Sequence, residues 1–456
     1  MRTTRRIIDA DRTAAALALI ASLSALSAMT ASCPSSEGDA LPVDGGGDTQ
    51  TDAGADAVNE DVTDAGPVDA ALVDAAPLTI TCDAPPCAIA LTTTLPSDGS
   101  SRDEGYCAIL TDGTVACWGT NKSGQLGDPA FTEPDSPIAV RVPGLSKVTA
   151  LDHTCAVDEE GAAWCWGSGP FLQSEAATAT VEASPVRLPL PGPASKLAIE
   201  STVGCAILRD ASVLCWGTNG RQQVSAEPEM YGKRNELPHP IPLAAGARDI
   251  AVGNATFALH DDGRVSSWGA LPALGRPSAI PADGSPARIA LEHVTSVVTT
   301  GAEACAVANG VGWCWGPPDV LSSLSPSPYI RALPTAIDTP EPITRIATTA
   351  SRSVSQSTQS VFEKRRWCAV GVSGDVYCWG LNNAGQAGDG TNDYALGTVR
   401  VTGLPAPAAE VKVMPYSTCA ILTNGKVYCW GNNATGQLGA GLPKGSFTAP
   451  TEVTLP

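Results

Sequence analysis

The sequence predicts an all-β protein, a seven-bladed β-propeller in which most blades contain a disulfide-stapled hairpin and which a disordered acidic linker precedes. Three observations predict this fold: one short pattern occurs seven times, most copies lie about 50 residues apart, and each copy is apolar on both faces. Repeats of this length with strand signals are typical of propeller blades rather than helical solenoids. A strand pair that is apolar on both faces must be packed between neighbours, as a blade is.

The repeated pattern is C-A-(I/V)-x-x-x-G-x-V-x-C-W-G. Its copies begin at Cys107, Cys155, Cys205, Phe257, Cys305, Cys368 and Cys419, and their Trp-Gly pairs begin at Trp118, Trp166, Trp216, Trp268, Trp315, Trp379 and Trp430. Periodic tryptophans are normally core residues, so we interpret these seven as packing between blades. In the first copy, Cys107 shares one face with Ile109 and Val115, and Trp118 lies on the other.

The spacing within each copy predicts a tight hairpin. Cys107 and Cys117 are centred on a three-residue loop, 111–113, whose glycine suits a left-handed conformation. The loops 372–374 and 423–425 have the same form. In the fifth copy, Cys305 and Cys314 are one residue closer and are centred on Asn309-Gly310, a preferred two-residue turn. Every cysteine pair therefore remains directly opposed across its hairpin.

The fourth copy supports pairing, because Phe257 and Ser267 replace both cysteines together. Directly opposed strand residues can reach disulfide distance. We predict the pairs Cys82–Cys87, Cys107–Cys117, Cys155–Cys165, Cys205–Cys215, Cys305–Cys314, Cys368–Cys378 and Cys419–Cys429. Zinc is the alternative, but the cysteine spacing is not that of a zinc knuckle and the four histidines form no cluster. We therefore expect neither a metal nor a cofactor.

The first 32 residues are interpreted as a signal peptide of the lipoprotein type, because arginines precede an apolar run too short to span a membrane. Small residues then precede Cys33, the predicted lipidation site, although Thr30 occupies a position where leucine is usual. Ordinary cleavage nearby is the alternative. Residues 33–86 are predicted to be a disordered Asp/Ala/Gly-rich linker, and residues 87–456 the propeller. We expect a protein outside the cytoplasm, either in the cell envelope (an outer-membrane lipoprotein) or secreted.

The run CAILTDGTVACWGTNKSGQLGD resembles the repeat of the regulator of chromosome condensation family, as do VYCWGLNNAGQAGDG and VYCWGNNATGQLGAG. The string W-G-x-N-x-x-G-Q-x-G is clear in copies one, six and seven, blurred in copy three, and absent after Trp166, Trp268 and Trp315. The resemblance covers residues 107–456, and residues 87–106 are included with them. It implies a seven-bladed propeller, here in a bacterial, secreted or lipid-anchored version.

Relatives in eukaryotes act as nucleotide-exchange factors for a small GTPase, and some bind chromatin. We disfavour exchange activity, which would rest on family analogy alone, because no matching wedge segment is evident and export separates the chain from cytosolic GTPases. The net charge of −19 argues against nucleic-acid binding. The last residues, 449–456, are expected to join blade one and close the ring, which removes exposed sheet edges.

Loops between blades carry the aromatic residues, which is typical of partner-binding surfaces. Residues 351–366 form an insertion that ends in a basic cluster, and its polar half is expected to be mobile. The candidate partner-binding residues are Phe131, Phe171, Tyr231, Tyr329, Phe362, Lys364, Arg365, Arg366, Tyr394 and Phe447. The alternative is that each aromatic packs on its own blade and that the basic cluster is a solvated loop.

The preferred function is an exported scaffold, lipid-anchored and monomeric, whose loop face binds a protein and which touches a membrane only through its anchor. A carbohydrate-binding propeller is the alternative, since loop tyrosine, phenylalanine and asparagine residues suit sugars. Catalysis is not expected, because motifs such as G-x-S-x-G, H-E-x-x-H and a phosphate loop are absent from the sequence. Carboxylates around the central channel would be the route to a hydrolase or lyase.

Overall fold

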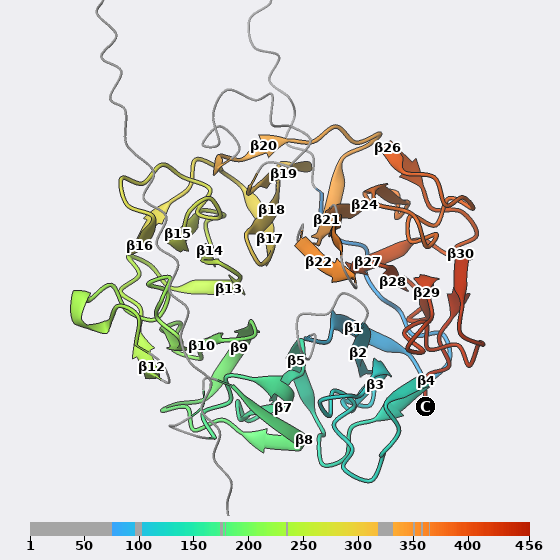
Figure 1. Cartoon of the computed structure of the whole chain (residues 1–456), viewed down its shortest axis with the longest axis horizontal. Helices are drawn as coiled ribbons and strands as arrows, with labels where there is room; N and C mark the ends of the chain where they lie inside the picture. Colours follow the sequence, from blue (N-terminus) through green and yellow to red (C-terminus); the bar gives the residue numbers. More distant parts are fainter. Residues whose placement is uncertain are drawn as a thin grey trace, which may run out of the picture. The chain divides into compact units, whose positions relative to one another are not determined.

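The computed structural model contains seven antiparallel sheets of four strands, arranged in a ring (Figure 1). It describes residues 75–95, 103–173, 177, 179–233, 236–317, 332–349, 352–356, 359–363 and 365–456. The chain divides into two units, residues 1–68 and 69–456, and the described residues all belong to the second. The predicted all-β, seven-bladed propeller is therefore confirmed.

Each blade is built from consecutive strands, and the first strand of each lies nearest the centre of the ring. Blades one to three comprise β1 (Ala88–Thr93), β2 (Gly105–Leu110), β3 (Val115–Thr120), β4 (Asp135–Arg141), β5 (Val148–Asp152), β6 (Cys155–Asp158), β7 (Ala163–Gly169), β8 (Thr180–Arg187), β9 (Ala194–Ile199), β10 (Val203–Leu208), β11 (Val213–Gly217) and β12 (Glu236–Pro240). A 3-10 helix, η1 (Pro228–Met230), precedes β12.

The remaining four blades follow the same order, with one inserted strand pair in blade six. They comprise β13 (Ala247–Val252), β14 (Ala255–His260), β15 (Val265–Ala270), β16 (Ala282–Arg288), β17 (Val294–Thr300), β18 (Glu303–Ala308), β19 (Val311–Trp315), β20 (Thr335–Ala336), β21 (Ile343–Thr348), β24 (Arg366–Gly371), β25 (Val376–Gly380), β26 (Ala395–Arg400), β27 (Ala408–Val413), β28 (Ser417–Leu422), β29 (Val427–Asn432) and β30 (Ser446–Glu452). The inserted pair, β22 (Arg352–Gln356) and β23 (Gln359–Glu363), forms a separate two-stranded sheet between β21 and β24.

The hairpins have the predicted register. In blade one, Cys107 lies directly opposite Cys117, and Gly113 in the loop has a φ of 76°. In blade five, Asn309 and Gly310 have φ angles of 52° and 74°, as a two-residue turn requires. All seven predicted disulfides are present, six across hairpins and one between Cys82 and Cys87.

Blade four replaces the disulfide by packing and hydrogen bonding. Phe257 lies opposite Ser267, as predicted, and the phenyl ring meets Trp315 of blade five edge-on at 5.5 Å. Ser267 Oγ donates to the carbonyl of Leu274 at 2.7 Å. Both side chains are fully buried, so the blade keeps a filled core without the covalent link.

The repeat tryptophans join neighbouring blades, as predicted. In six of the seven blades the indole Nε1 donates to a carbonyl of the preceding blade at 2.6–3.0 Å: Trp118 to Gln437, Trp166 to Gln125, Trp216 to Pro170, Trp268 to Gln223, Trp315 to Ala273 and Trp430 to Gln386. A buried indole needs such a partner, because an unpaired buried N–H is costly. Trp379 of blade six differs, since it is half-buried and stacks on Trp367 at 5.8 Å.

The two faces of each hairpin contact different neighbours. The face of blade one that carries Cys107 and Ile109 packs against Trp166 of blade two. The other face, which carries Leu110 and Trp118, packs against blade seven. The hydrophobic core is therefore a series of layers between blades, and each blade depends on both neighbours.

The ring is closed by both ends of the described chain, and this differs from the prediction for the C-terminus. Strand β30 pairs with β29 inside blade seven rather than joining blade one. The residues after it reach blade one, where Thr454 accepts a hydrogen bond from the Ala139 backbone at 3.4 Å. Pro456 accepts another from Arg141 at 3.1 Å. The C-terminal residues thus seal the seam beside β4.

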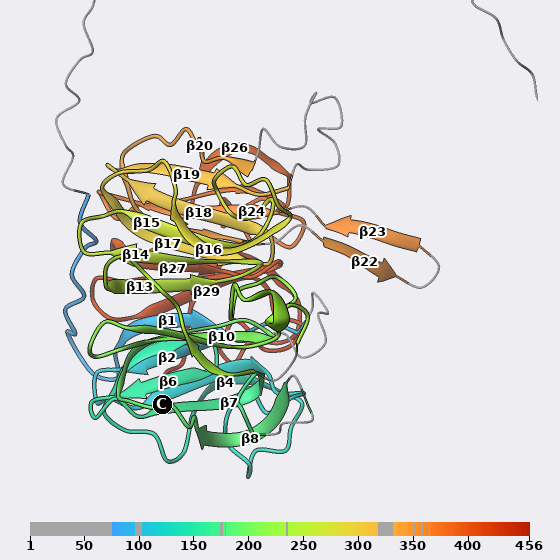
Figure 2. The same cartoon turned by 90° about the vertical axis from the view of Figure 1, so that its left-hand side faces the viewer.

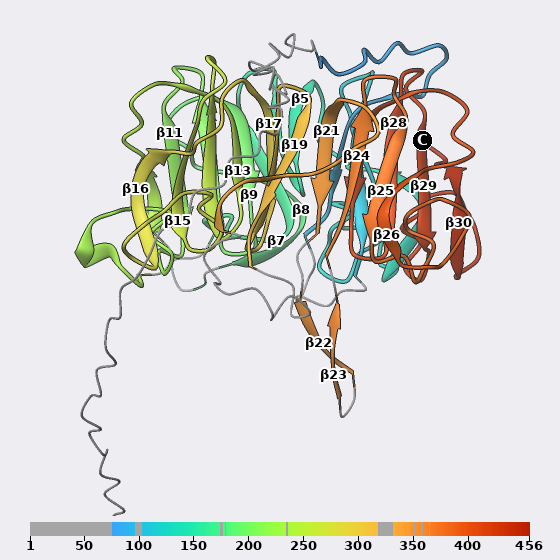
Figure 3. The ribbon, with the colours of Figure 1, turned by 90° about the horizontal axis from the view of Figure 1, so that it is seen from above.

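Residues 75–87 form a strap along the hairpin turns (Figure 3). Ala75 lies beside Gly310 of blade five, Leu78 beside Gly374 of blade six, and Cys87 beside Gly425 of blade seven. The Thr81 backbone donates to Thr423 at 2.6 Å before the chain enters blade one. The linker was predicted to be disordered through residue 86, but its last twelve residues, 75–86, are part of the propeller unit because hydrogen bonds and a disulfide hold them there.

Candidate partner-binding site

The two faces of the ring differ in what covers them. We call the face with the β2–β3 type of hairpin turns the turn face, and the strap lies on it. The opposite face, the insertion face, carries the loops that join first to second strands and third to fourth strands. Figures 2 and 3 show β22 and β23 projecting from the insertion face, away from the strap.

The β22–β23 hairpin occupies the segment that was predicted to be an insertion with a mobile polar half. Its backbone is paired in register from Arg352 opposite Glu363 to Gln356 opposite Gln359. Val354 and Val361 lie opposite each other, and β-branched residues of this kind favour extended strands. The insertion is therefore an ordered feature in its strands, and it contains Phe362, one of the predicted binding residues.

The two arginines at the base of this hairpin are interior residues, which corrects their prediction as surface cations. Arg366 is fully buried and donates to the carbonyls of Gln386, Met414 and Ser417 at 2.6, 2.7 and 2.9 Å. Burial lowers the pKa of Arg366 to about 10. Its five donors suit a cluster of backbone acceptors between blades six and seven, so it joins those blades instead of facing a partner.

Arg365 likewise forms an ion pair with Glu303 of blade five, and both side chains are buried. Its guanidinium also lies 5.1 Å from the Trp367 ring centre, where a cation–π interaction is favourable. The basic cluster thus ties blade six to both of its neighbours. Lys364, the third member of the predicted cluster, lies outside the described residues.

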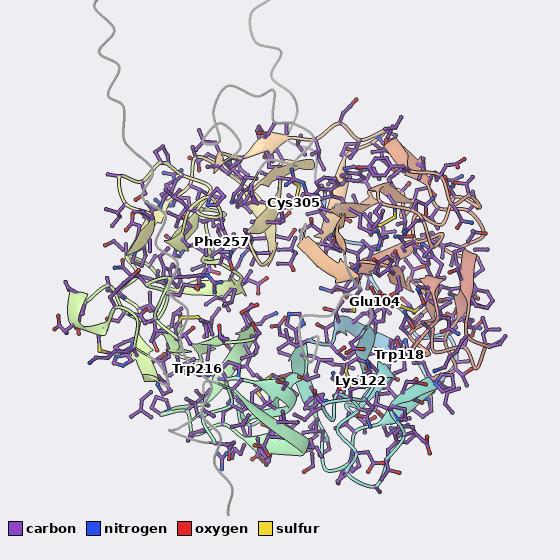
Figure 4. All side chains as sticks on the ribbon, viewed as in Figure 1. Glu104, Trp118, Lys122, Trp216, Phe257 and Cys305 are labelled. Atoms are coloured by element: carbon purple, nitrogen blue, oxygen red, sulfur yellow. A yellow bond between two sulfur atoms is a disulfide. The ribbon has the colours of Figure 1, made fainter. Side chains whose placement is uncertain are left out.

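Glu104, which was not predicted as a site residue, precedes β2 of blade one and contacts blade seven (Figure 4). It is fully buried and accepts hydrogen bonds from the Tyr416 backbone and Ser417 Oγ, both at 2.6 Å. Burial raises the pKa of Glu104 to about 7, against the opposing effect of those hydrogen bonds and of Arg366. In three blades a charged residue stands two or three positions before the buried repeat cysteine: Glu104, Glu303 and Arg366. This spacing is the sequence signal that could have identified these buried charges.

The aromatic candidates have different environments. Phe171 is completely buried in the core between blades two and three, so its prediction as a binding residue is wrong. Phe131 and Phe447 are half-buried against their own cores. Tyr231 and Tyr394 are exposed, at 59% and 40%, but they belong to blades three and six. Tyr329 lies outside the described residues.

The central channel is a cavity of about 550 Å³ walled by the innermost strand of every blade. Acidic residues outnumber basic ones in its wall. The acids are Asp103, Glu104, Asp152, Glu200, Asp249 and Glu410, and the bases are Lys196, Arg345 and Lys412. Lys412 Nζ lies 3.1 Å from Glu410 Oε1, and Asp152 accepts from the Ile199 backbone at 2.8 Å. Glu410 and Asp152 therefore have partners already, and in the part of the chain that the structure describes no group of His, Cys, Asp and Glu side chains could hold a metal.

Comparison with known proteins agrees with this architecture. Residues 415–437 match the family model described as the regulator of chromosome condensation (RCC1) repeat. Protein pim1 of Schizosaccharomyces pombe (strain 972 / ATCC 24843) is 31% identical over 223 residues, which cover 42% of this chain and 38% of that protein. The chain therefore spans about two fifths of the length of that relative.

Two solved structures share the fold. Human WBSCR16 has a TM-score of 0.60 and 19% identity, over 75% of this chain and 95% of that one. Prp20p of Saccharomyces cerevisiae, described with its binding properties to Gsp1p and histones, has a TM-score of 0.59 and 19% identity, over 76% and 87%. The fold and the repeat define a closed seven-bladed propeller. The chain is similar to the propellers built from regulator of chromosome condensation repeats, through one matched repeat at residues 415–437 and through the shared fold.

Proposed function

We propose that this chain is an exported, lipid-anchored scaffold that binds a protein partner through the insertion face of blade six. The observation that carries the proposal is the β22–β23 hairpin, which projects from the insertion face. The strap occupies the opposite face. A rigid ring with one added projection is suited to recognition, because binding loops gain from a rigid support.

Export is supported by the cysteines. Each of the fourteen cysteines in the described residues belongs to a disulfide. Disulfides persist in oxidising compartments and are rare in the cytosol. Within the described residues no helix has the length and apolar character to cross a membrane. Attachment through Cys33 after removal of residues 1–32 completes the proposal.

A protein partner is favoured over a glycan because the exposed tyrosines do not share one platform. Tyr231 follows η1 in blade three, whereas Tyr394 precedes β26 in blade six, on another side of the ring (Figure 1). Related propellers are also described with protein partners, among them Kap60 for yeast RCC1 and Gsp1p and histones for Prp20p. The acidic chain makes nucleic acid an unfavourable partner.

The test compares capture by the full chain with capture by a variant in which a Gly-Ser turn replaces residues 352–363. Both proteins are immobilised, exposed to envelope and secreted fractions of the source cells, and their retained proteins quantified by mass spectrometry. We expect one dominant protein that the hairpin-deleted variant does not retain. Equal retention by both variants would contradict a binding role for blade six. Metabolic labelling with palmitate, lost in Cys33→Ser, tests the anchor separately.

A further inference from the structure

The outer strand of each blade has an edge that could pair with another chain. In every blade the backbone N–H of the residue that directly follows this strand donates inward to the third strand at 2.8–3.0 Å. These residues are Val142, Leu188, Ile241, Ile289, Ile337, Val401 and Val453. The residue three positions earlier immediately precedes a residue that pairs with the third strand, and in six blades it ends a β-bulge. Because neighbouring backbone groups point to opposite sides of a strand, its N–H is directed outward, as the Ala139 N–H is. These seven outward positions can be compared directly between blades.

Five of the seven outward positions are proline: Pro185, Pro238, Pro286, Pro334 and Pro450. Proline has no N–H, so these edges cannot form a regular ladder with an added strand. In blade one the position is Ala139, whose N–H donates to Thr454 of the C-terminal residues. Six edges are therefore closed, which is how proteins commonly protect edge strands.

Blade six is the exception, because its outward position is Thr398 in β26. The neighbouring outward position is Arg400, since Val399 pairs with Cys378 and Val401 donates inward at 2.8 Å. Two consecutive outward backbone positions are thus open, with the spacing that strand addition uses. Among the outer strands that the structure describes, β26 alone has this combination.

The side chains beside this edge are also unusual. Leu396 is 93% exposed, more than any other large apolar residue in the described part of the chain. Arg400 is already paired with Asp375 at 2.6 Å. Asp393 is exposed just before the strand, so the start of the edge is acidic. An added strand would find an apolar contact at Leu396 and a negative charge near Asp393.

We propose that β26 is a docking strand, to which an extended segment of a protein partner adds as a fifth strand of blade six. The segment has no proline at its central positions, an aliphatic side chain beside Leu396 and a lysine or arginine near Asp393. This inference rests on the proposed function, because it names how blade six engages the partner. The hairpin and the open edge belong to the same blade, so one partner can contact both.

The test uses a phage-displayed library of linear random peptides, selected on the full chain. Enriched peptides should match the stated chemistry and bind Thr398→Pro about tenfold or more weakly, because the variant removes the central N–H. The control, Thr398→Val, keeps the N–H and should bind as the wild type does. Thr398→Pro is expected to fold, since five blades already carry proline at this position. Leu396→Lys should weaken binding severalfold as a second, independent variant.

The opposite results are equally clear. A selection without enriched peptides, or peptides whose affinity survives Thr398→Pro, overturns the docking strand. Sedimentation of the free chain tests whether a second copy of the chain occupies the edge. A concentration-dependent dimer that Thr398→Pro abolishes would assign the edge to a second copy, and the proposal of a partner segment would then be wrong. If the hairpin-deleted variant loses the captured protein while Thr398→Pro retains it, the proposed function stands and this inference fails. If neither variant affects capture, both fail.

Discussion

Blades four and six both depart from the repeat, but in opposite directions. Blade four has no disulfide, and contacts in its interior replace it: the Phe257 ring packs against Trp315, and Ser267 Oγ donates to the Leu274 carbonyl. Its outer edge is still closed by Pro286. Blade six keeps its disulfide and changes outside, with an inserted hairpin and with Thr398 where five other blades have proline. Its tryptophan, Trp379, is also less buried than the others.

The comparison separates structural variation from functional variation. A change that is compensated by new internal contacts, as in blade four, preserves the fold and leaves the surface alone. A change that exposes apolar and backbone groups without internal compensation, as at Leu396 and Thr398, must be explained by something outside the blade. This is why we place the binding function on blade six.

The largest expected effect concerns the tryptophans. Trp268→Ala should lower the free energy of unfolding by about 3–5 kcal/mol, because it removes a fully buried ring and its hydrogen bond to Gln223. Trp379→Ala should cost about 1–2 kcal/mol, since that ring is half-buried. Urea denaturation of both variants measures the difference. Equal losses would show that blade six is as tightly integrated as blade four.

Next comes the disulfide that blade six has and blade four lacks. Replacing Cys368 and Cys378 together by alanine should lower stability by about 2–3 kcal/mol, because a closed hairpin loop is released in the unfolded chain. The converse change, Phe257→Cys with Ser267→Cys, should form a disulfide, since these residues are directly opposed. Alkylation of the unreduced variant followed by mass spectrometry reports it. Free thiols at both positions would contradict the shared register.

Glu104 predicts an unusual dependence of stability on pH. Burial raises its pKa to about 7, above the ordinary value of about 4.3. The folded state therefore holds a proton that the unfolded chain releases, so this contribution is complete below about pH 4 and is lost as the pH rises through about 7. Glu104→Gln should flatten the fall in stability over that range by about 1–3 kcal/mol.

Asp112 provides the control of opposite sign. The Thr114 hydroxyl and backbone N–H, followed by Arg141, hold its pKa down at about 2. Its contribution is present above the unfolded pKa and is lost as the pH falls towards about 2. Asp112→Asn should therefore change the pH profile only on the acid side. Denaturation of both variants across pH tests this, and identical profiles would exclude Glu104 as the source of the neutral-range effect.

The smallest expected effect is on the stability of the edge itself. Thr398→Pro should change the free energy of unfolding by less than about 1 kcal/mol, because its N–H has no role inside the blade. Val401→Pro is the matched contrast and should cost about 2–4 kcal/mol, since Val401 donates to Val376 at 2.8 Å. Thermal unfolding distinguishes them, and a large loss in Thr398→Pro would mean that this N–H faces inward.

The sequence predicted the repeated hairpins well because their information is local. Loop length and the positions of glycine determine register, and register determines which cysteines are opposed. The same sequence pattern predicted that Trp118 and Cys107 lie on opposite faces of the hairpin, and their packing against different neighbouring blades confirms this. The wrong or missing parts depend on which segments meet across the ring.

Arg365 and Arg366 illustrate this limit. A run of cations suggests a solvated loop, yet the two arginines are buried because carbonyls of blade seven and Glu303 of blade five face them. The strap was missed because it binds through backbone and small side chains. The prolines of the outer strands were visible in the sequence, but their meaning required knowing which backbone groups point outward.

The most direct test of the account is hydrogen exchange of the full chain, alone and with the captured partner. Blade six should gain protection in residues 352–363 and 395–400, while the equivalent outer strand of blade four, residues 282–288, should remain unchanged. Protection that falls instead on the strap or on blade four, with blade six unaffected, would contradict the claim that blade six is the docking blade.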